Sequence, residues 1–73
     1  MRRYTIMLIA DPDVGGYTVI VPALPECVTE GDTVEEAMCR ARALIRGYVE
    51  SRAANGEAVP KEPVAIQFAT VEV

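Results

Sequence analysis

Apolar and polar residues recur along the chain in patterns that predict four strands and one helix. The strands are expected at residues 4–10, 17–21, 27–30 and 64–71, where apolar and β-branched residues predominate between turn-forming segments. Aspartate, proline and glycine at residues 11–16 form a turn, so the first two strands make a hairpin. Pro22 and Pro25 have no backbone donor and therefore end sheet pairing after the second strand.

The helix is the most strongly patterned segment of the chain. It begins after Thr33, whose side chain forms a capping box with Glu36, and it ends at Asn55-Gly56. Apolar residues recur at positions 34, 37, 38, 41, 44, 45, 48 and 49, within one arc of the helix surface. We expect this stripe, including Leu44, to be buried against the sheet, while Arg46 faces water.

Together these elements predict a single α+β domain over residues 1–73, with the order β-β-β-α-β. One helix packs on one face of a four-stranded, mostly antiparallel sheet, which makes a two-layer structure. Because crossovers between parallel neighbours are right-handed, we expect the strand order 3-2-1-4. The uncovered sheet face carries Met7 and Ile9 or their neighbours, so we expect a homodimer or higher homo-oligomer through this face or a strand edge.

The composition favours a protein partner over a nucleic acid. Of the 73 residues, 51% are apolar, which is generous for a small monomer and supports a subunit interface. The net charge is −4. An acidic chain is poorly suited to nonspecific nucleic-acid binding, which needs Lys and Arg to displace phosphate counterions. The same charge suits a basic protein partner.

The cysteines and the hydropathy of the chain indicate a reduced, cytoplasmic protein. Two cysteines are too few for a disulfide framework, and no run approaches a signal peptide or the ~20 apolar residues of a membrane span. Neither Cys27 nor Cys39 has a histidine partner, because the chain contains no histidine. We interpret Cys27 as a packing residue, and Cys39 as either a solvent-facing thiol or one made reactive by Arg40 and Arg42. We expect no cofactor and no zinc site.

The stretch from residue 16 to residue 37 carries a specific pattern: a strand, a Pro-x-x-Pro corner, a second short strand, a Gly-Asp-Thr turn and the helix start. The matching residues are Gly16-Tyr17, Val21-Pro22, Leu24-Pro25, Cys27, Thr29, Gly31-Asp32-Thr33 and Glu35-Glu36-Ala37, with Gly56, Pro60 and Pro63 further on. In these positions the chain resembles the HicB family of antitoxin-like domains over nearly its whole length. Glu26 departs from the family, which usually has glycine there.

The resemblance implies a partial ribonuclease H-like topology and a protein-binding role. The implied partner is a HicA-like toxin, a small basic messenger-RNA-cleaving protein that is held inactive by occlusion. Family members often carry a C-terminal DNA-binding segment, whereas this chain ends at Val73, so we expect no direct DNA binding. Nucleases of ribonuclease H-like architecture hold metal with carboxylates. A nuclease remnant would need Asp11, Asp13 and Asp32 to converge, although all three are also ordinary turn and cap residues.

The Pro22–Glu26 corner is the clearest candidate for recognition. Its two prolines hold the intervening loop rigidly, and a preorganised loop loses less entropy on binding. A tight corner without a binding role is the alternative. We expect a basic partner to meet the acidic surface around Leu24, Glu26, Glu30 and Asp32, and no residue to be catalytic. Besides the nuclease remnant, a solitary homo-oligomeric domain of unknown role is a third functional hypothesis.

Overall fold

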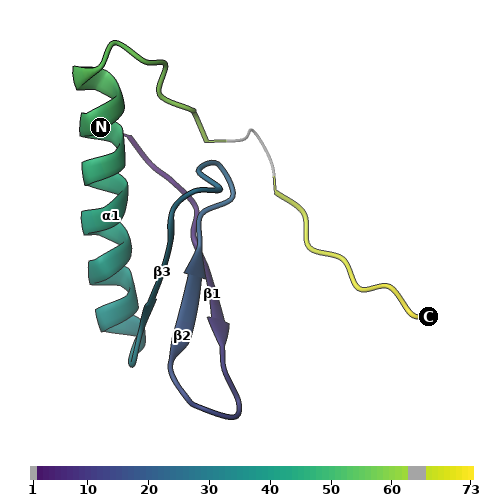
Figure 1. Cartoon of the computed structure of the whole chain (residues 1–73). Helices are drawn as coiled ribbons and strands as arrows, with labels where there is room; N and C mark the ends of the chain where they lie inside the picture. The colour runs from purple at the N-terminus through teal and green to yellow at the C-terminus, as the bar shows by residue number, and fades with distance from the viewer. Residues whose placement is uncertain (1, 63–65) are drawn as a thin grey trace.

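Three strands and one helix form in the order that the sequence predicts (Figure 1). The computed structural model describes residues 2–62 and 66–73. The strands are β1 (Met7–Ala10), β2 (Tyr17–Ile20) and β3 (Val28–Gly31), and the helix is α1 (Val34–Ala54). The strands are antiparallel in the order β1-β2-β3, and α1 lies against one face of the sheet. The protein is therefore a two-layer α+β structure, as expected.

Local capping chemistry sets the ends of α1. The Thr33 hydroxyl accepts a hydrogen bond from the backbone N–H of Glu36 at 3.1 Å, which satisfies a donor that has no partner inside the helix. The helix ends at the cap residue Asn55, and Gly56 follows with a φ of 72°. Both predicted ends are confirmed. The Glu36 side chain pairs with Arg40 at 3.1 Å.

The core consists of two adjoining clusters of buried side chains. In the first, Ala37 and Ala41 of α1 pack on Val19 of β2. Their small size allows the helix to approach the sheet closely. In the second, Val21, Leu24 and Cys27 of the proline corner pack beneath the later turns of the helix. The two clusters hold the helix along its length and place the corner under its second half.

The apolar stripe predicted on α1 is too wide. Ala37 and Ala41 are buried, whereas Val34, Met38 and Leu44 are exposed, and Leu44 keeps 36% of its surface accessible. The expected burial of Leu44 is therefore wrong. The physical reason is that α1 contacts β3 and β2, so only the part of the stripe above these two strands is covered.

The predicted fourth strand is not shown. Residues 66–73 extend away from the helix and sheet without forming a strand (Figure 1). The beginning of the predicted strand, residues 64–65, lies outside the described residues. The order 3-2-1-4 is likewise not shown, because its last member is missing from the sheet of the described residues. Within these residues, no helix combines the length and apolarity that crossing a membrane requires.

The sheet face opposite the helix is open and partly apolar. Leu8 and Val19 point towards α1, so their neighbours in β1 and β2 point to the other side. Ile9 and Val28 are exposed there, with 44% and 57% of their surfaces accessible. One helix thus covers one face only, as the element order implies.

Candidate partner-binding surface

The proline corner is anchored in the core. The backbone N–H of Leu24 donates to the carbonyl of Val21 at 2.9 Å, and that of Cys27 donates to the carbonyl of Leu24 at 2.8 Å. These bonds wind the corner tightly and direct the Leu24 side chain inward, where none of its surface is accessible. Leu24 therefore lies in the core and not on the acidic surface around it, and its part in partner binding stays a prediction. Its place is beneath Ile45 and Tyr48 of α1.

The thiol of Cys27 is an internal packing group. It is buried beside Leu24, and burial, with a smaller contribution from the Glu26 carboxylate, raises the pKa of this thiol above its ordinary value. A buried thiol that resists ionisation is a poor nucleophile. The interpretation of Cys27 as a packing residue is confirmed, and Cys39 lies exposed on α1.

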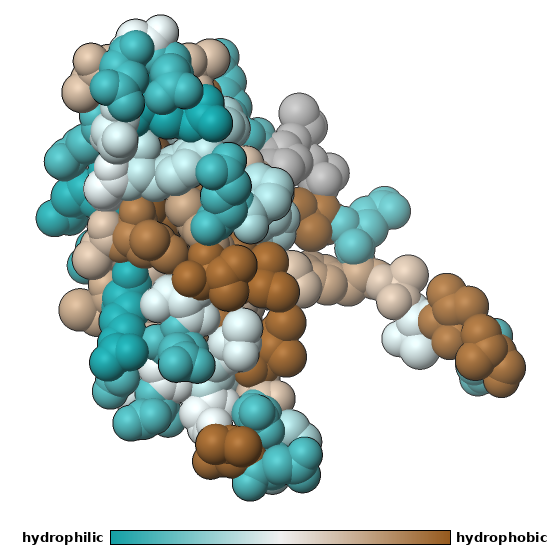
Figure 2. All heavy atoms as spheres, viewed as in Figure 1, coloured by the Kyte–Doolittle hydropathy of each residue, from teal (hydrophilic) through white to brown (hydrophobic). Residues whose placement is uncertain are grey.

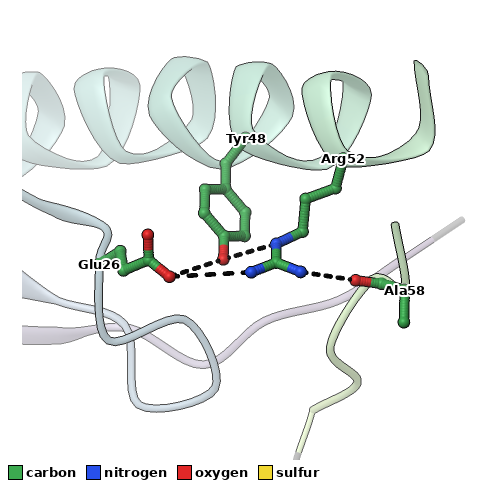
Figure 3. A network of polar contacts seen from close by, with 4 residues as sticks. All are labelled: Glu26, Tyr48, Arg52 and Ala58. Atoms are coloured by element: carbon green, nitrogen blue, oxygen red, sulfur yellow. Dashed lines mark hydrogen bonds and ion pairs between the residues drawn. The ribbon is translucent and has the colours of Figure 1, made fainter. Parts of the chain in front are cut away.

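Glu26 belongs to a polar network that joins three segments of the chain (Figure 3). The Tyr48 hydroxyl donates to the Glu26 carboxylate at 3.3 Å and accepts from Nε of Arg52 at 2.8 Å. Arg52 also lies 3.8 Å from the Glu26 carboxylate and donates to the carbonyl of Ala58 at 3.0 Å. The hydrogen bond to Tyr48 raises the pKa of Arg52. The network ties the corner and the loop after α1 to the end of the helix, and 71% of the Glu26 side chain stays accessible.

Glu30 and Asp32 lie at the opposite end of β3 from Glu26. They line a hollow of about 250 Å³ where the β1–β2 turn meets the start of α1. Two more carboxylates, Asp11 and Glu36, line the same hollow. We call this surface the acidic hollow and define it by these four residues. Its one cation is Arg40, which pairs with Glu36 at 3.1 Å and donates to the backbone carbonyl of Glu30 at 3.4 Å.

Two glycines bring the walls of the acidic hollow together. Gly16 has a φ of 80°, and a Cβ added there would lie 3.0 Å from the carbonyl oxygen of Gly31. A Cβ added to Gly31 would lie 2.5 Å from the backbone nitrogen of Ala37. The absence of side chains at these positions lets the hairpin turn, β3 and the helix start approach one another. Asp11 and Glu36 therefore join Glu30 and Asp32, although no local pattern in the sequence links them.

The carboxylates that would serve a nuclease are not assembled as metal ligands. Oδ1 of Asp11 accepts from the backbone N–H groups of Asp13 at 2.9 Å and Val14 at 3.1 Å. These bonds lower the pKa of Asp11 and identify it as a turn-stabilising residue. Among residues 2–62 and 66–73, no group of three or more His, Cys, Asp or Glu side chains is placed to hold a metal ion. Asp11 and Asp32 line the acidic hollow, whereas Asp13 is not among its lining residues.

Comparison with known proteins gives a consistent result over nearly the whole chain. Residues 4–72 match the family described as HicB-like antitoxin of bacterial toxin–antitoxin systems. A UPF0150 protein of Thermoplasma acidophilum is 42% identical over 60 residues, which cover 82% of this chain and 86% of the relative. A UPF0150 protein of Synechocystis sp. is 39% identical over 65 residues, covering 89% and 81%. An uncharacterised 14.9 kDa protein of Haemophilus phage HP1 is 41% identical over 53 residues, which are 73% of this chain and 40% of that protein.

Proposed function

This chain belongs to the HicB-like antitoxins of bacterial toxin–antitoxin systems, and we propose that it neutralises a small basic HicA-like, RNA-cleaving toxin in the cytoplasm by occluding it. The family suggests a non-enzymatic role and implies a toxin as partner. The observation that carries the choice of surface is the acidic hollow, in which four carboxylates from three different segments face one already paired guanidinium. This surface is proposed as the contact with the toxin.

The proposed mechanism is competition for positive charge. A toxin that cleaves RNA needs Lys and Arg to bind the phosphate backbone. Carboxylates held on a preformed surface bind the same cations in place of RNA. Because the walls of the acidic hollow are fixed by close backbone packing, little entropy is lost when the toxin docks. Complementary charge mainly accelerates association and makes it dependent on salt.

The four residues that the sequence nominates have different parts in this proposal. Glu30 and Asp32 make the direct contact, because they lie together in the acidic hollow. Glu26 is a peripheral contact, since its charge is shared with Arg52 at the other end of β3. Leu24 acts from the core by holding the corner in place.

Binding kinetics with a candidate toxin test the proposal. The candidate is a short basic protein encoded next to this chain, and association is measured at two salt concentrations. Glu30→Lys combined with Asp32→Lys should slow association ~10-fold or more and reduce its salt dependence. Glu50→Lys combined with Glu57→Lys changes the net charge equally, away from the acidic hollow, and is the matched control. Equal effects of the two pairs would show that only net charge matters.

A cleavage assay separates occlusion from catalysis. The toxin should lose RNA cleavage when this protein is added in equimolar amount, and the Glu30→Lys, Asp32→Lys variant should restore cleavage. The protein alone with magnesium is the control, and we expect it to leave RNA intact. Magnesium-dependent cleavage by the protein itself, abolished by Asp11→Asn, would replace the proposal with a nuclease.

A further inference from the structure

The sheet face opposite α1 carries a continuous apolar strip. The strand register places Met7, Ile20 and Val28 side by side across the three strands, where opposed side chains lie ~5 Å apart. Ile9 follows on the same face of β1 and keeps 44% of its surface accessible, and Val28 keeps 57%. We call these four residues the apolar strip. In Figure 2, hydrophobic surface lies over the strands on the side away from α1.

The apolar strip is joined to the acidic hollow by Thr18 and Glu30. The register pairs Ile9 with Thr18 and Thr18 with Glu30, in the next row of this face. Both Thr18 and Glu30 also line the acidic hollow. One surface therefore runs from apolar side chains at the corner end of the sheet to carboxylates at the other end. Glu30 is the ionisable residue of the two rows, so this face has a negative end and no positive one.

This combination fits a basic protein better than a second copy of the chain. Protein interfaces have an apolar centre and a polar rim, and their charges are complementary across the contact. A second copy carries the same net charge of −4 and the same carboxylates beside its strip, so the two would repel each other. Stable dimers also bury about 800 Å² on each partner, which is more than four partly covered side chains expose.

We propose that the apolar strip is the second half of the toxin-binding surface, where the toxin buries apolar side chains that are bordered by Lys or Arg. This inference rests on the proposed function, because it concerns the same toxin. The two halves act on different steps of binding. The acidic hollow sets the rate and the salt dependence of association, and burial of the strip sets the rate of dissociation. The toxin that fits has an exposed apolar patch beside its cations.

Dissociation kinetics with the candidate toxin test the apolar strip. Val28→Thr, alone and combined with Ile9→Thr, puts hydroxyl groups into the strip, and the β-branched threonine should preserve the strands. Hydroxyls buried without a partner should make the double variant release the toxin at least ~10-fold faster, with the association rate and its salt dependence unchanged. Val34→Thr is the matched control for Val28→Thr, because Val34 is 40% accessible but lies on α1, and its release rate should not change. Circular dichroism checks that each variant keeps its fold.

The outcomes separate this inference from the proposed function. If the wild type does not bind the toxin, both fail. If Glu30→Lys with Asp32→Lys slows association but Ile9→Thr with Val28→Thr releases the toxin at the wild-type rate, the inference alone fails. Sedimentation of the protein without toxin covers the other occupant. A strip variant that weakens self-association and leaves toxin release unchanged would identify the strip as a contact between copies and overturn the inference.

Cross-saturation from unlabelled toxin to the methyl groups of this protein locates the contact by nuclear magnetic resonance. In the complex, the methyl signals of Ile9 and Val28 should lose intensity, and that of Val34 should keep it. Loss of intensity at Val34, with the Ile9 and Val28 signals unchanged, would place the toxin on the helix side of the molecule and refute the inference.

Discussion

The Leu24→Ala substitution should remove a large part of the stability of this small domain, and Leu44→Ala is its matched control. The chemical change is the same at both positions, but Leu24 has no accessible surface and Leu44 keeps 36%. Leu24 also lies between Val21 and Cys27 in the second core cluster, so its removal leaves a closed cavity. The two variants therefore separate burial from side-chain type.

The expected losses follow from these exposures. Removing three carbons from a buried site costs ~2.4 kcal/mol at ~0.8 kcal/mol for each CH₂. The cavity at Leu24 adds to this, which gives a loss of about 3 to 4 kcal/mol, within the usual range for Leu→Ala. A chain of 73 residues has roughly 4 to 11 kcal/mol of stability in total. Leu44→Ala leaves no closed cavity and introduces a better helix former, so it should cost about 1 kcal/mol or less.

Urea denaturation followed by far-ultraviolet circular dichroism measures both free energies of unfolding. The series is run at several protein concentrations, because self-association would make the apparent free energy of unfolding depend on concentration. A Leu24→Ala loss about 2 kcal/mol or more above that of Leu44→Ala supports the observed packing. Similar losses of unfolding free energy at the two positions would refute the reasoning. A larger loss at Leu44 would indicate that the apolar stripe is buried as the sequence predicts.

Three further predictions concern the glycines, the cysteines and one carboxylate. Gly31→Ala should cost ~2 kcal/mol or more in urea unfolding, because its Cβ would lie 2.5 Å from the helix backbone. A Cβ added to Gly47 would have no atom within 4 Å, so Gly47→Ala should raise the free energy of unfolding by up to ~1 kcal/mol. A lower free energy of unfolding in both glycine variants would contradict the observed packing. Iodoacetamide should modify Cys39 before Cys27 in the native protein, as mass spectrometry can show; the reverse order would contradict the burial of Cys27. Hydrogen bonds from backbone amides lower the pKa of Asp11 below 3.8 in the folded protein. The ionised Asp11 carboxylate therefore stabilises the fold fully above pH 3.8, and this stabilisation is lost as the pH falls through the pKa of the folded state. A titration midpoint at or above 3.8 by nuclear magnetic resonance would contradict the observed turn.

Elements whose signals are local are predicted well from this sequence. The helix begins after Thr33 and ends at Asn55 because capping depends on residues within one turn of each end. The hairpin forms because Gly15 and Gly16 adopt the positive φ that its turn requires. The family pattern likewise lies in residues close together along the chain, and it identifies the antitoxin family before any contact is known.

The candidate site is predicted less well, because its members meet through contacts distant in sequence. Glu26 and Asp32 are six positions apart, yet β3 carries them to opposite ends of the sheet. Asp11 joins the acidic hollow only because the hairpin turn, β3 and the helix start approach closely at Gly16 and Gly31.

Residue pattern alone therefore determines where the helix begins and ends, which family the chain belongs to, and that its net charge is negative. The tertiary structure decides which apolar residues are covered. Leu24 and Leu44 are chemically identical, but the corner turns Leu24 beneath the helix, whereas Leu44 lies on a part of the helix that the sheet leaves uncovered. Burial depends on the atoms that surround a side chain, and those atoms are brought there by distant parts of the chain.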